Sequence, residues 1–133
     1  MSIMIPRPVP QLSSPRIVRE LMETGRRVRV ESGATLFREG DPVTDVFCVA
    51  SGNVIVTRHA ENGERQIIAF LFPGDFLGMT FADAHLTGAE ALTDSEAWAL
   101  PQATLKRGLE TRPELGLAFA EMATRIINSE MDV

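Results

Sequence analysis

The stretch from Gln66 to Leu105 contains no lysine or arginine, although it contains five carboxylates. These acids are Asp75, Asp83, Glu90, Asp94 and Glu96. Proteins hold a phosphate or a similar anion with guanidinium, ammonium or clustered N–H groups, and carboxylates repel it. This part of the chain therefore offers an anionic ligand no side-chain cation of its own.

The chain as a whole is also acidic. Its 133 residues carry a formal net charge of −5. A nucleic-acid surface needs clustered Lys and Arg side chains against the phosphates, so we expect no DNA binding by this chain alone. With 44% hydrophobic residues, the length suits a single domain with its own core.

Two histidines, His59 and His85, are available for acid–base or metal chemistry. A cupin-type iron or manganese site needs two or three histidines and a carboxylate, and the chain has no His-x-His pair. It also has no P-loop, no GxGxxG fingerprint and no Ser–His–Asp arrangement. The sequence predicts neither an enzyme nor a metal site. We expect His85, in a polar loop, to be solvated.

The single cysteine, Cys48, falls within an expected strand, with Val46 and Ala50 on the same face. This pattern favours a small buried apolar side chain, and redox sensing is the alternative. One thiol forms no intramolecular disulfide and suits a reducing compartment. The longest purely apolar run, Ile67–Phe72, is too short to span a membrane. We expect a cytoplasmic protein without a membrane anchor.

The first elements are an extended arm over residues 1–12 and a short helix. Ser13 and Ser14 offer a helix cap, Pro15 suits the first helical position, and Gly25 can end the helix. Apolar residues recur at helical spacing between them. These features predict one amphipathic helix before the first strand.

From Arg26 the apolar period becomes two, which indicates short strands separated by glycine turns. Asn62 and Gly63 predict a type I′ turn between strands at residues 53–59 and 64–72. Other strands are expected at residues 27–31, 35–37, 45–50, 89–92 and 95–100. Seven or eight such strands predict a mainly β fold of jelly-roll or related barrel type.

Two helices are expected after the last strand, over Gln102–Leu109 and from Pro113 to about Asn128. Four apolar residues of the longer helix follow the a/d spacing of a heptad seam. Such a stripe either packs on the barrel of its own chain or joins two chains in a two-fold helix pair. In the second case the dimerisation residues are Leu115, Phe119, Met122 and Ile126.

Three motifs in this order resemble the cyclic-nucleotide-binding-domain family. They are Ser32–Asp41 (SGATLFREGD), Val46–Gly52 (VFCVASG) and Pro73–Gly78 (PGDFLG). The stretches Asn62–Phe70 and Thr87–Asp94 are similar to the oxygen and nitrogen regulators of the Crp/Fnr superfamily, especially the FixK-like branch.

This resemblance implies a double-stranded β-helix of jelly-roll type, with an N-terminal helix and a short helix after the last strand, over residues 13–112. It also implies a long C-terminal dimerisation helix over residues 113–133. In the family a helix-turn-helix domain follows and reads DNA. The sequence shows no helix-turn-helix domain, so DNA is expected as a partner only through a domain that this chain lacks.

The resemblance also places a ligand pocket at Gly78–Ala89, called the cassette loop below. In members that bind cyclic nucleotides, a glutamate holds the ribose and an arginine holds the phosphate. The equivalent positions here look like Met79 and Thr87, which offer neither a carboxylate nor a guanidinium. The candidate ligand-pocket residues are Gly78, Met79, Thr80, Thr87, Gly88 and Ala89.

Losing a charge-assisted pair in a desolvated site costs on the order of 2–5 kcal/mol, where about 1.4 kcal/mol is tenfold in affinity. Cyclic AMP and cyclic GMP are therefore not expected to bind in the usual mode, unless Arg58 or Arg65 folds in from the hairpin. Two alternatives then remain for the pocket. It binds a different ligand that is apolar or weakly polar, or it is collapsed and filled by its own side chains. The side chains expected to fill a collapsed pocket are Phe76, Leu77, Met79 and Phe81.

The sequence thus indicates the sensory and dimerisation domain of a Crp/Fnr-type bacterial transcriptional regulator, with an unknown small-molecule effector. The alternative is a stand-alone cyclic-nucleotide-binding module without DNA-binding activity. No cofactor is predicted. Some relatives carry an iron–sulfur cluster on four cysteines, which this chain lacks, and others bind haem, for which His59 or His85 would be the candidate ligand.

Overall fold

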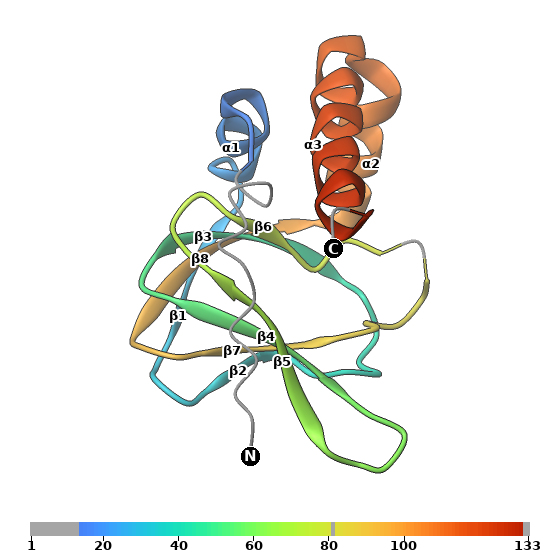
Figure 1. Ribbon diagram of the computed structural model, residues 1–133. Coiled ribbons are helices and arrows are strands. Elements are labelled where there is room, and N and C mark those ends of the chain that lie inside the picture. Colours follow the sequence, from blue (N-terminus) through green and yellow to red (C-terminus); the bar gives the residue numbers. More distant parts are fainter. Residues whose placement is uncertain (1–13, 81, 132–133) are drawn as a thin grey trace.

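A computed structural model describes residues 14–80 and 82–131, and it describes side chains as far as Met122. Within these ranges the chain forms eight strands and three helices (Figure 1). The strands are β1 Arg26–Val30, β2 Thr35–Phe37, β3 Asp45–Ser51, β4 Val54–His59, β5 Arg65–Leu71, β6 Phe76–Leu77, β7 Gly88–Ala91 and β8 Ser95–Pro101. The helices are α1 Arg16–Met22, α2 Gln102–Thr111 and α3 Pro113–Met131.

The strands form two antiparallel four-stranded sheets, in the orders β1-β8-β3-β6 and β2-β7-β4-β5. A buried apolar cluster that includes Phe37, Phe47, Val49 and Leu77 joins strands of both sheets. This arrangement confirms the expected mainly β jelly roll. The strand β6 was not expected from the sequence, because two residues give no readable period.

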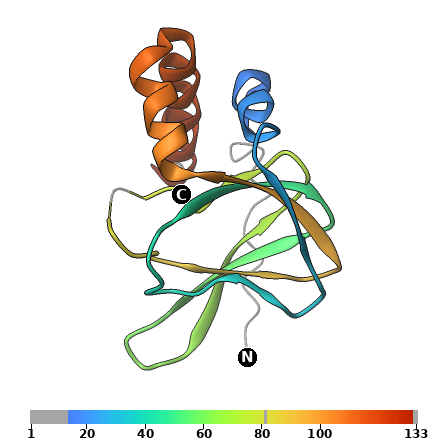
Figure 2. The same ribbon diagram turned by 180° about the vertical axis from the view of Figure 1, so that it is seen from behind.

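The three helices lie together over the sheet that contains β3 and β8 (Figures 1 and 2). Val46 and Cys48 of β3 belong to a cluster shared with these helices, whereas Phe47 and Val49 belong to the cluster between the sheets. Both faces of β3 are therefore covered by apolar groups. This explains why the strand is apolar at successive positions instead of alternating.

The helix α1 begins without the expected serine cap. Its N-cap residue is Pro15, and no side chain caps the first turn. The Ser14 hydroxyl instead donates to the Gly74 carbonyl at 2.5 Å, and the Ser14 backbone N–H donates to the same carbonyl at 2.9 Å. Ser14 therefore fastens the start of α1 to the turn between β5 and β6. Ser13 lies outside the described residues.

The hairpin between β4 and β5 forms as expected, but its turn is not of type I′. That turn needs a positive φ at both central residues, and in the described ranges no residue other than glycine has one. Gly63 has a φ of 84°, and its N–H donates to the Ala60 carbonyl at 2.9 Å. Asn62 uses its side chain instead, accepting from the Glu64 N–H at 2.9 Å. The longer loop accommodates Asn62 without strain.

The seam of α3 packs on its own chain as far as Met122. Leu115 is fully buried, and Phe119 and Met122 are also buried in the cluster between the helices and the sheet. The ring of Phe119 meets Phe76 edge-on, with centroids 5.4 Å apart. This agrees with the intrachain alternative for these three residues. The side chain of Ile126 lies outside the described residues, and dimerisation stays a prediction.

Replacing Leu115 with alanine should lower the free energy of unfolding by about 2–5 kcal/mol, because a fully buried side chain leaves a cavity. Leu86→Ala is the matched control, since Leu86 is 65% exposed and should change the stability by less than about 0.5 kcal/mol. Urea denaturation of both variants measures the difference. Equal effects of the two substitutions would contradict the burial of α3 against the barrel.

Candidate functional site

The cassette loop is held against the connection between β2 and β3 by backbone hydrogen bonds. The His85 N–H donates to the Asp41 carbonyl at 2.9 Å, and the Gly40 N–H donates to the His85 carbonyl at 2.8 Å. A third bond joins the Val43 N–H to the Asp83 carbonyl at 3.0 Å. At its other end the loop reaches the helices, because the Gln102 side-chain amide donates to the Thr80 carbonyl at 3.0 Å.

The imidazole of His85 lies inside the fold and not in solvent. It stacks on the ring of Phe37 with centroids 3.9 Å apart and an angle of 16° between the planes. Phe37 also stacks on Phe47 at 5.7 Å. His85 is only 5% exposed, so the expectation of a solvated loop histidine is wrong. The apolar rings that surround the imidazole explain why a polar loop residue turns inward.

Burial lowers the pKa of His85 below its ordinary value, and the nearby Asp41 charge opposes this shift only in part. The imidazole is therefore neutral near pH 7. A neutral ring adds no cation to the cassette loop.

The two ends of the cassette loop both meet Phe37. A Cβ on Gly78 would lie 3.4 Å from the Phe37 ring and 3.2 Å from Phe47, and Gly78 has a φ of 90°. A Cβ on Gly88 would lie 3.6 Å from the Phe37 carbonyl and 3.0 Å from the Thr57 hydroxyl. Glycine is needed at position 78 for its backbone conformation and at position 88 for space.

The six residues assigned to the pocket from the sequence are all part of the cassette loop, but their side chains lie in different environments. Gly88 and Ala89 are buried at the start of β7, and Thr87 is half-buried. Met79 packs against the cluster beneath the helices, which lies on the outer side of the β3 sheet. Thr80 uses its hydroxyl to accept from the Ala82 N–H at 3.1 Å.

The side chains that fill the cassette region also differ from the four that were expected from the sequence. Phe76 and Met79 belong to the cluster beneath the helices, and Leu77 to the cluster between the sheets. Phe81 lies outside the described residues. The rings that meet at the cassette loop are Phe37, Phe47 and His85. Sequence reasoning missed Phe37 and Phe47, although their strand positions permitted an inward orientation, and nothing near His85 signalled its stacking.

The two arginines that were considered as substitute cations are placed differently by the structure. The Arg65 guanidinium forms an ion pair with Glu90 of β7, so an acid that borders the cassette neutralises its charge. Arg58 is exposed on β4. Neither arginine is thus available as an unpaired buried cation.

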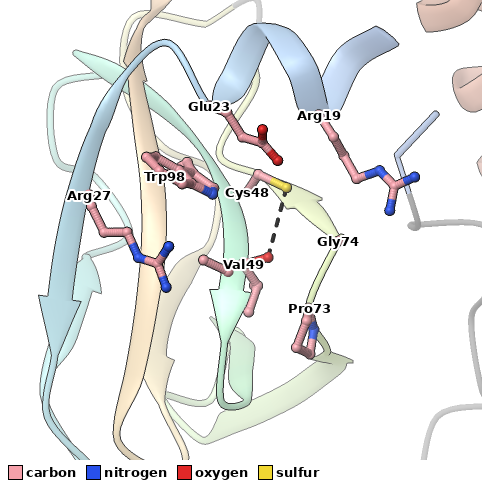
Figure 3. Close-up of a pocket in the computed structure, with 9 residues that line it drawn as sticks. Arg19, Glu23, Arg27, Cys48, Val49, Pro73, Gly74 and Trp98 are labelled. Atoms are coloured by element: carbon pink, nitrogen blue, oxygen red, sulfur yellow. Dashed lines mark hydrogen bonds between the residues drawn. The ribbon is translucent and has the colours of Figure 1, made fainter. Parts of the chain in front are cut away.

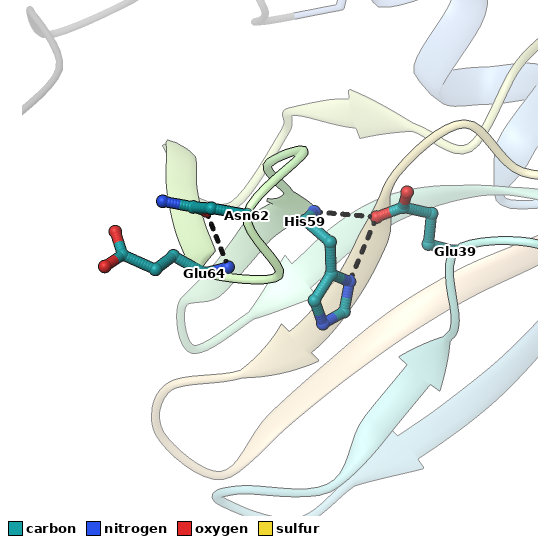
Figure 4. A network of polar contacts seen from close by, with 4 residues as sticks. All are labelled: Glu39, His59, Asn62 and Glu64. Atoms are coloured by element: carbon teal, nitrogen blue, oxygen red, sulfur yellow. Dashed lines mark hydrogen bonds and ion pairs between the residues drawn. The ribbon is translucent and has the colours of Figure 1, made fainter.

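A further carboxylate stands where β4 meets the β2–β3 connection (Figure 4). The Glu39 Oε1 atom accepts from the His59 backbone N–H at 2.9 Å and lies 3.3 Å from the His59 Nδ1 atom. The backbone hydrogen bond is the main reason why the pKa of Glu39 is lowered. Glu39 therefore stays ionised, and its backbone N atom lies near Gly88. Glu39 thus places a negative charge beside the cassette loop, and the nearby Arg58 charge is a smaller cause of its lowered pKa.

Cys48 is 3% exposed, and burial raises the pKa of its thiol. The expectation of a small buried apolar side chain is confirmed. In the described ranges no three His, Cys, Asp or Glu side chains gather in a way that could hold a metal ion. None of the helices in those ranges is long and apolar enough to cross a membrane.

The family model of the cyclic nucleotide-binding domain matches residues 27–112. The chain belongs to this family. The nitrogen fixation regulation protein FixK of Bradyrhizobium diazoefficiens is 35% identical over 86% of the chain, and the match covers 48% of that protein. The chain thus spans about half the length of this relative. The recognised relatives are transcriptional regulators of the FixK, Fnr and Crp type.

Solved structures give the same fold for this cyclic nucleotide-binding domain. The catabolite activator protein of Thermus thermophilus aligns with a TM-score of 0.75 and 24% identity, over 90% of this chain and 58% of that chain. The sensor domain of the transcriptional regulator DNR of Pseudomonas aeruginosa aligns with a TM-score of 0.70 and 22% identity, over 94% and 87% of the two chains. At these identities the likeness concerns the fold alone.

The buried imidazole makes the stability of the domain depend on pH. Because the His85 pKa is lower in the folded state than the ordinary histidine value of 6.5, the unfolded chain binds the proton more readily. The contribution of His85 to stability is complete above about pH 6.5 and falls as the pH decreases toward the folded pKa.

His85→Phe keeps a stacking ring and removes the titration, so its stability should fall less than that of the wild type between pH 7 and pH 5. Urea denaturation at each pH measures this. Subtracting the two profiles removes the effect of other groups, such as Asp75, whose pKa burial raises. Parallel profiles for the two proteins would show that His85 is not buried as a neutral ring.

Proposed function

We propose that the chain is the sensory and dimerisation domain of a Crp/Fnr-type bacterial transcriptional regulator. Its effector region does not use a cyclic nucleotide in the usual mode. The family membership and the regulator FixK support the first part. DNA recognition would then belong to a further domain of the regulator, and the protein would work in the cytoplasm.

The observation that carries the second part is the stack of His85 on Phe37, between the ends of the cassette loop. A cyclic nucleotide in the usual mode would need the space near Gly78 and Ala89, so it would have to displace these rings. It would also meet the carboxylates of Glu39 and Glu90, and the unpaired guanidinium near them in the described ranges is that of the exposed Arg58. Missing charge-assisted bonds cost about 2–5 kcal/mol, which weakens binding by factors of about 30 or more.

The same contacts suggest how a change at the cassette loop would reach the helices. The bond from Gln102 to the Thr80 carbonyl fastens the loop to the first residue of α2. Leu105 of α2 and Leu115 of α3 then share one buried cluster. A shift of the loop would therefore move α2, and α3 would follow because the two helices are packed together.

The proposed dimer uses the long helix α3. Its inward face up to Met122 is occupied by the barrel, so the surface left for a second chain is the outward one. Leu117 lies there and is 62% exposed. A two-fold pairing of α3 would cover it.

Isothermal titration calorimetry tests the ligand part of this proposal. The purified domain should show no saturable heat with cyclic AMP or cyclic GMP at concentrations up to about 1 mM, because the site lacks the cation and the space. A micromolar dissociation constant for either nucleotide would instead favour the rival function, a stand-alone cyclic-nucleotide-binding module.

Leu117→Glu tests the dimer without disturbing the core. If α3 pairs through its outward face, the wild type sediments as a dimer and the variant as a monomer with an unchanged circular dichroism spectrum, because two charges would meet in an apolar contact. Leu86→Glu, at an exposed leucine of the cassette loop, is the control and should remain dimeric. The same sedimentation for wild type and Leu117→Glu would remove this face as the dimer interface.

A further inference from the structure

A cavity of about 330 Å³ opens on the outer side of the β1-β8-β3-β6 sheet, away from the cassette loop. Its wall comes from α1, three strands and the turn after β5 (Figure 3). The buried Cys48 and the half-buried Trp98 form part of its floor. The other lining residues are Arg19, Glu23, Arg27, Val49, Ala50, Pro73 and Gly74.

One cation at this cavity is held in a fixed position. The Arg27 Nε and Nη2 atoms donate to the same Glu96 oxygen at 3.0 and 2.6 Å. The centre of its guanidinium lies 5.0 Å from the centroid of the Trp98 ring. The ion pair and the stacking orient the group, and an arginine has five N–H donors, so others are left for a ligand.

Two opposite charges at the cavity are not paired with each other. Arg19 of α1 and Glu23, the C-cap residue of that helix, are four residues apart, a spacing at which opposite charges commonly form an ion pair. No ion pair joins them, and in the described part of the chain neither side chain pairs with another residue. Figure 3 shows Glu23 over Cys48 and Arg19 pointing away from it. The two charges stand apart at the opening.

This arrangement selects among ligand charges. A simple anion would be attracted by Arg19 and Arg27 but repelled by Glu23. A simple cation would be attracted by Glu23 but repelled by Arg19 and Arg27. A molecule that carries both an ammonium and a carboxylate matches both signs, and Ala50 and Pro73 offer apolar contacts for the rest of it.

We propose that this cavity binds a small zwitterion, namely a free α-amino acid with an apolar or aromatic side chain. Arg27 holds its carboxylate, Glu23 holds its ammonium group, and its side chain lies against Trp98 and Pro73, while Arg19 adds positive charge on the other side of the opening. The size is at the lower end of ligand pockets, which suits a molecule of this class. This site goes beyond the proposed function, since it lies outside the cassette loop and does not depend on it.

Trp98 reports on the site directly, because it is the only tryptophan of the chain. L-phenylalanine is the probe, titrated while tryptophan fluorescence is excited selectively. Two analogues with the same ring separate the charges: 3-phenylpropionate lacks the ammonium group and phenethylamine lacks the carboxylate. The expected result is saturable binding of L-phenylalanine with a dissociation constant on the order of 1 mM or below. Each analogue should bind at least about tenfold more weakly than L-phenylalanine does.

Arg27→Gln and Glu23→Gln keep the approximate size of the side chains and remove one charge each. Both variants should weaken L-phenylalanine binding by about tenfold, and circular dichroism confirms that they fold. Arg16→Gln is the matched control. Arg16 lies on the same helix, pairs with Glu20 and does not line the cavity, so this variant should bind as the wild type does.

Calorimetry with L-phenylalanine complements the fluorescence titration, in case binding leaves the indole emission unchanged. No saturable signal in either measurement would overturn the proposal. Equal affinities for L-phenylalanine and both analogues, or for the wild type and both charge variants, would overturn it as well. These outcomes are independent of the cyclic-nucleotide titrations, because the two sites lie on opposite sides of the β3 sheet.

Discussion

The stacking of His85 on Phe37 determines what the cassette region can accommodate. It places a neutral ring where a ligand of the usual kind would need space, and it lets both glycine ends of the loop close on Phe37. Glu90 is paired with Arg65, and the unpaired guanidinium near Glu39 in the described ranges, that of Arg58, is exposed and not buried at the loop. Under the proposed function, sterics and electrostatics would therefore act against the same ligand, and restoring a charge alone would not restore the space.

The strand β3 connects this region to the rest of the molecule. Its alternate side chains enter two different clusters, one between the sheets with Phe37 and one beneath the helices with Leu115. A displacement of the rings at the cassette loop would thus reach the helices by two routes, through β3 and through the Thr80–Gln102 bond. Packed side chains resist small deformations, so such a signal is better described as a switch between two packings than as gradual bending.

The sequence predicted the architecture well because strand periodicity, glycine turns and an α3 stripe are local signals. It predicted the burial of Cys48 for the same reason. It did not predict the turn at Asn62, since one Asn-Gly pair suits several loop lengths. It could not choose between the two roles of Leu115, because a helix stripe looks alike when it covers a barrel or a partner. The stacking of His85 and the fastening of Ser14 to Gly74 are long-range contacts without a local pattern.

A crystal structure of the domain grown with excess cyclic AMP would show whether the ring stack at the cassette loop excludes the nucleotide. We predict that His85 remains stacked on Phe37 and that no nucleotide lies between Gly78 and Ala89. A nucleotide seated there, with its phosphate met by a guanidinium and the His85 ring displaced, would contradict it.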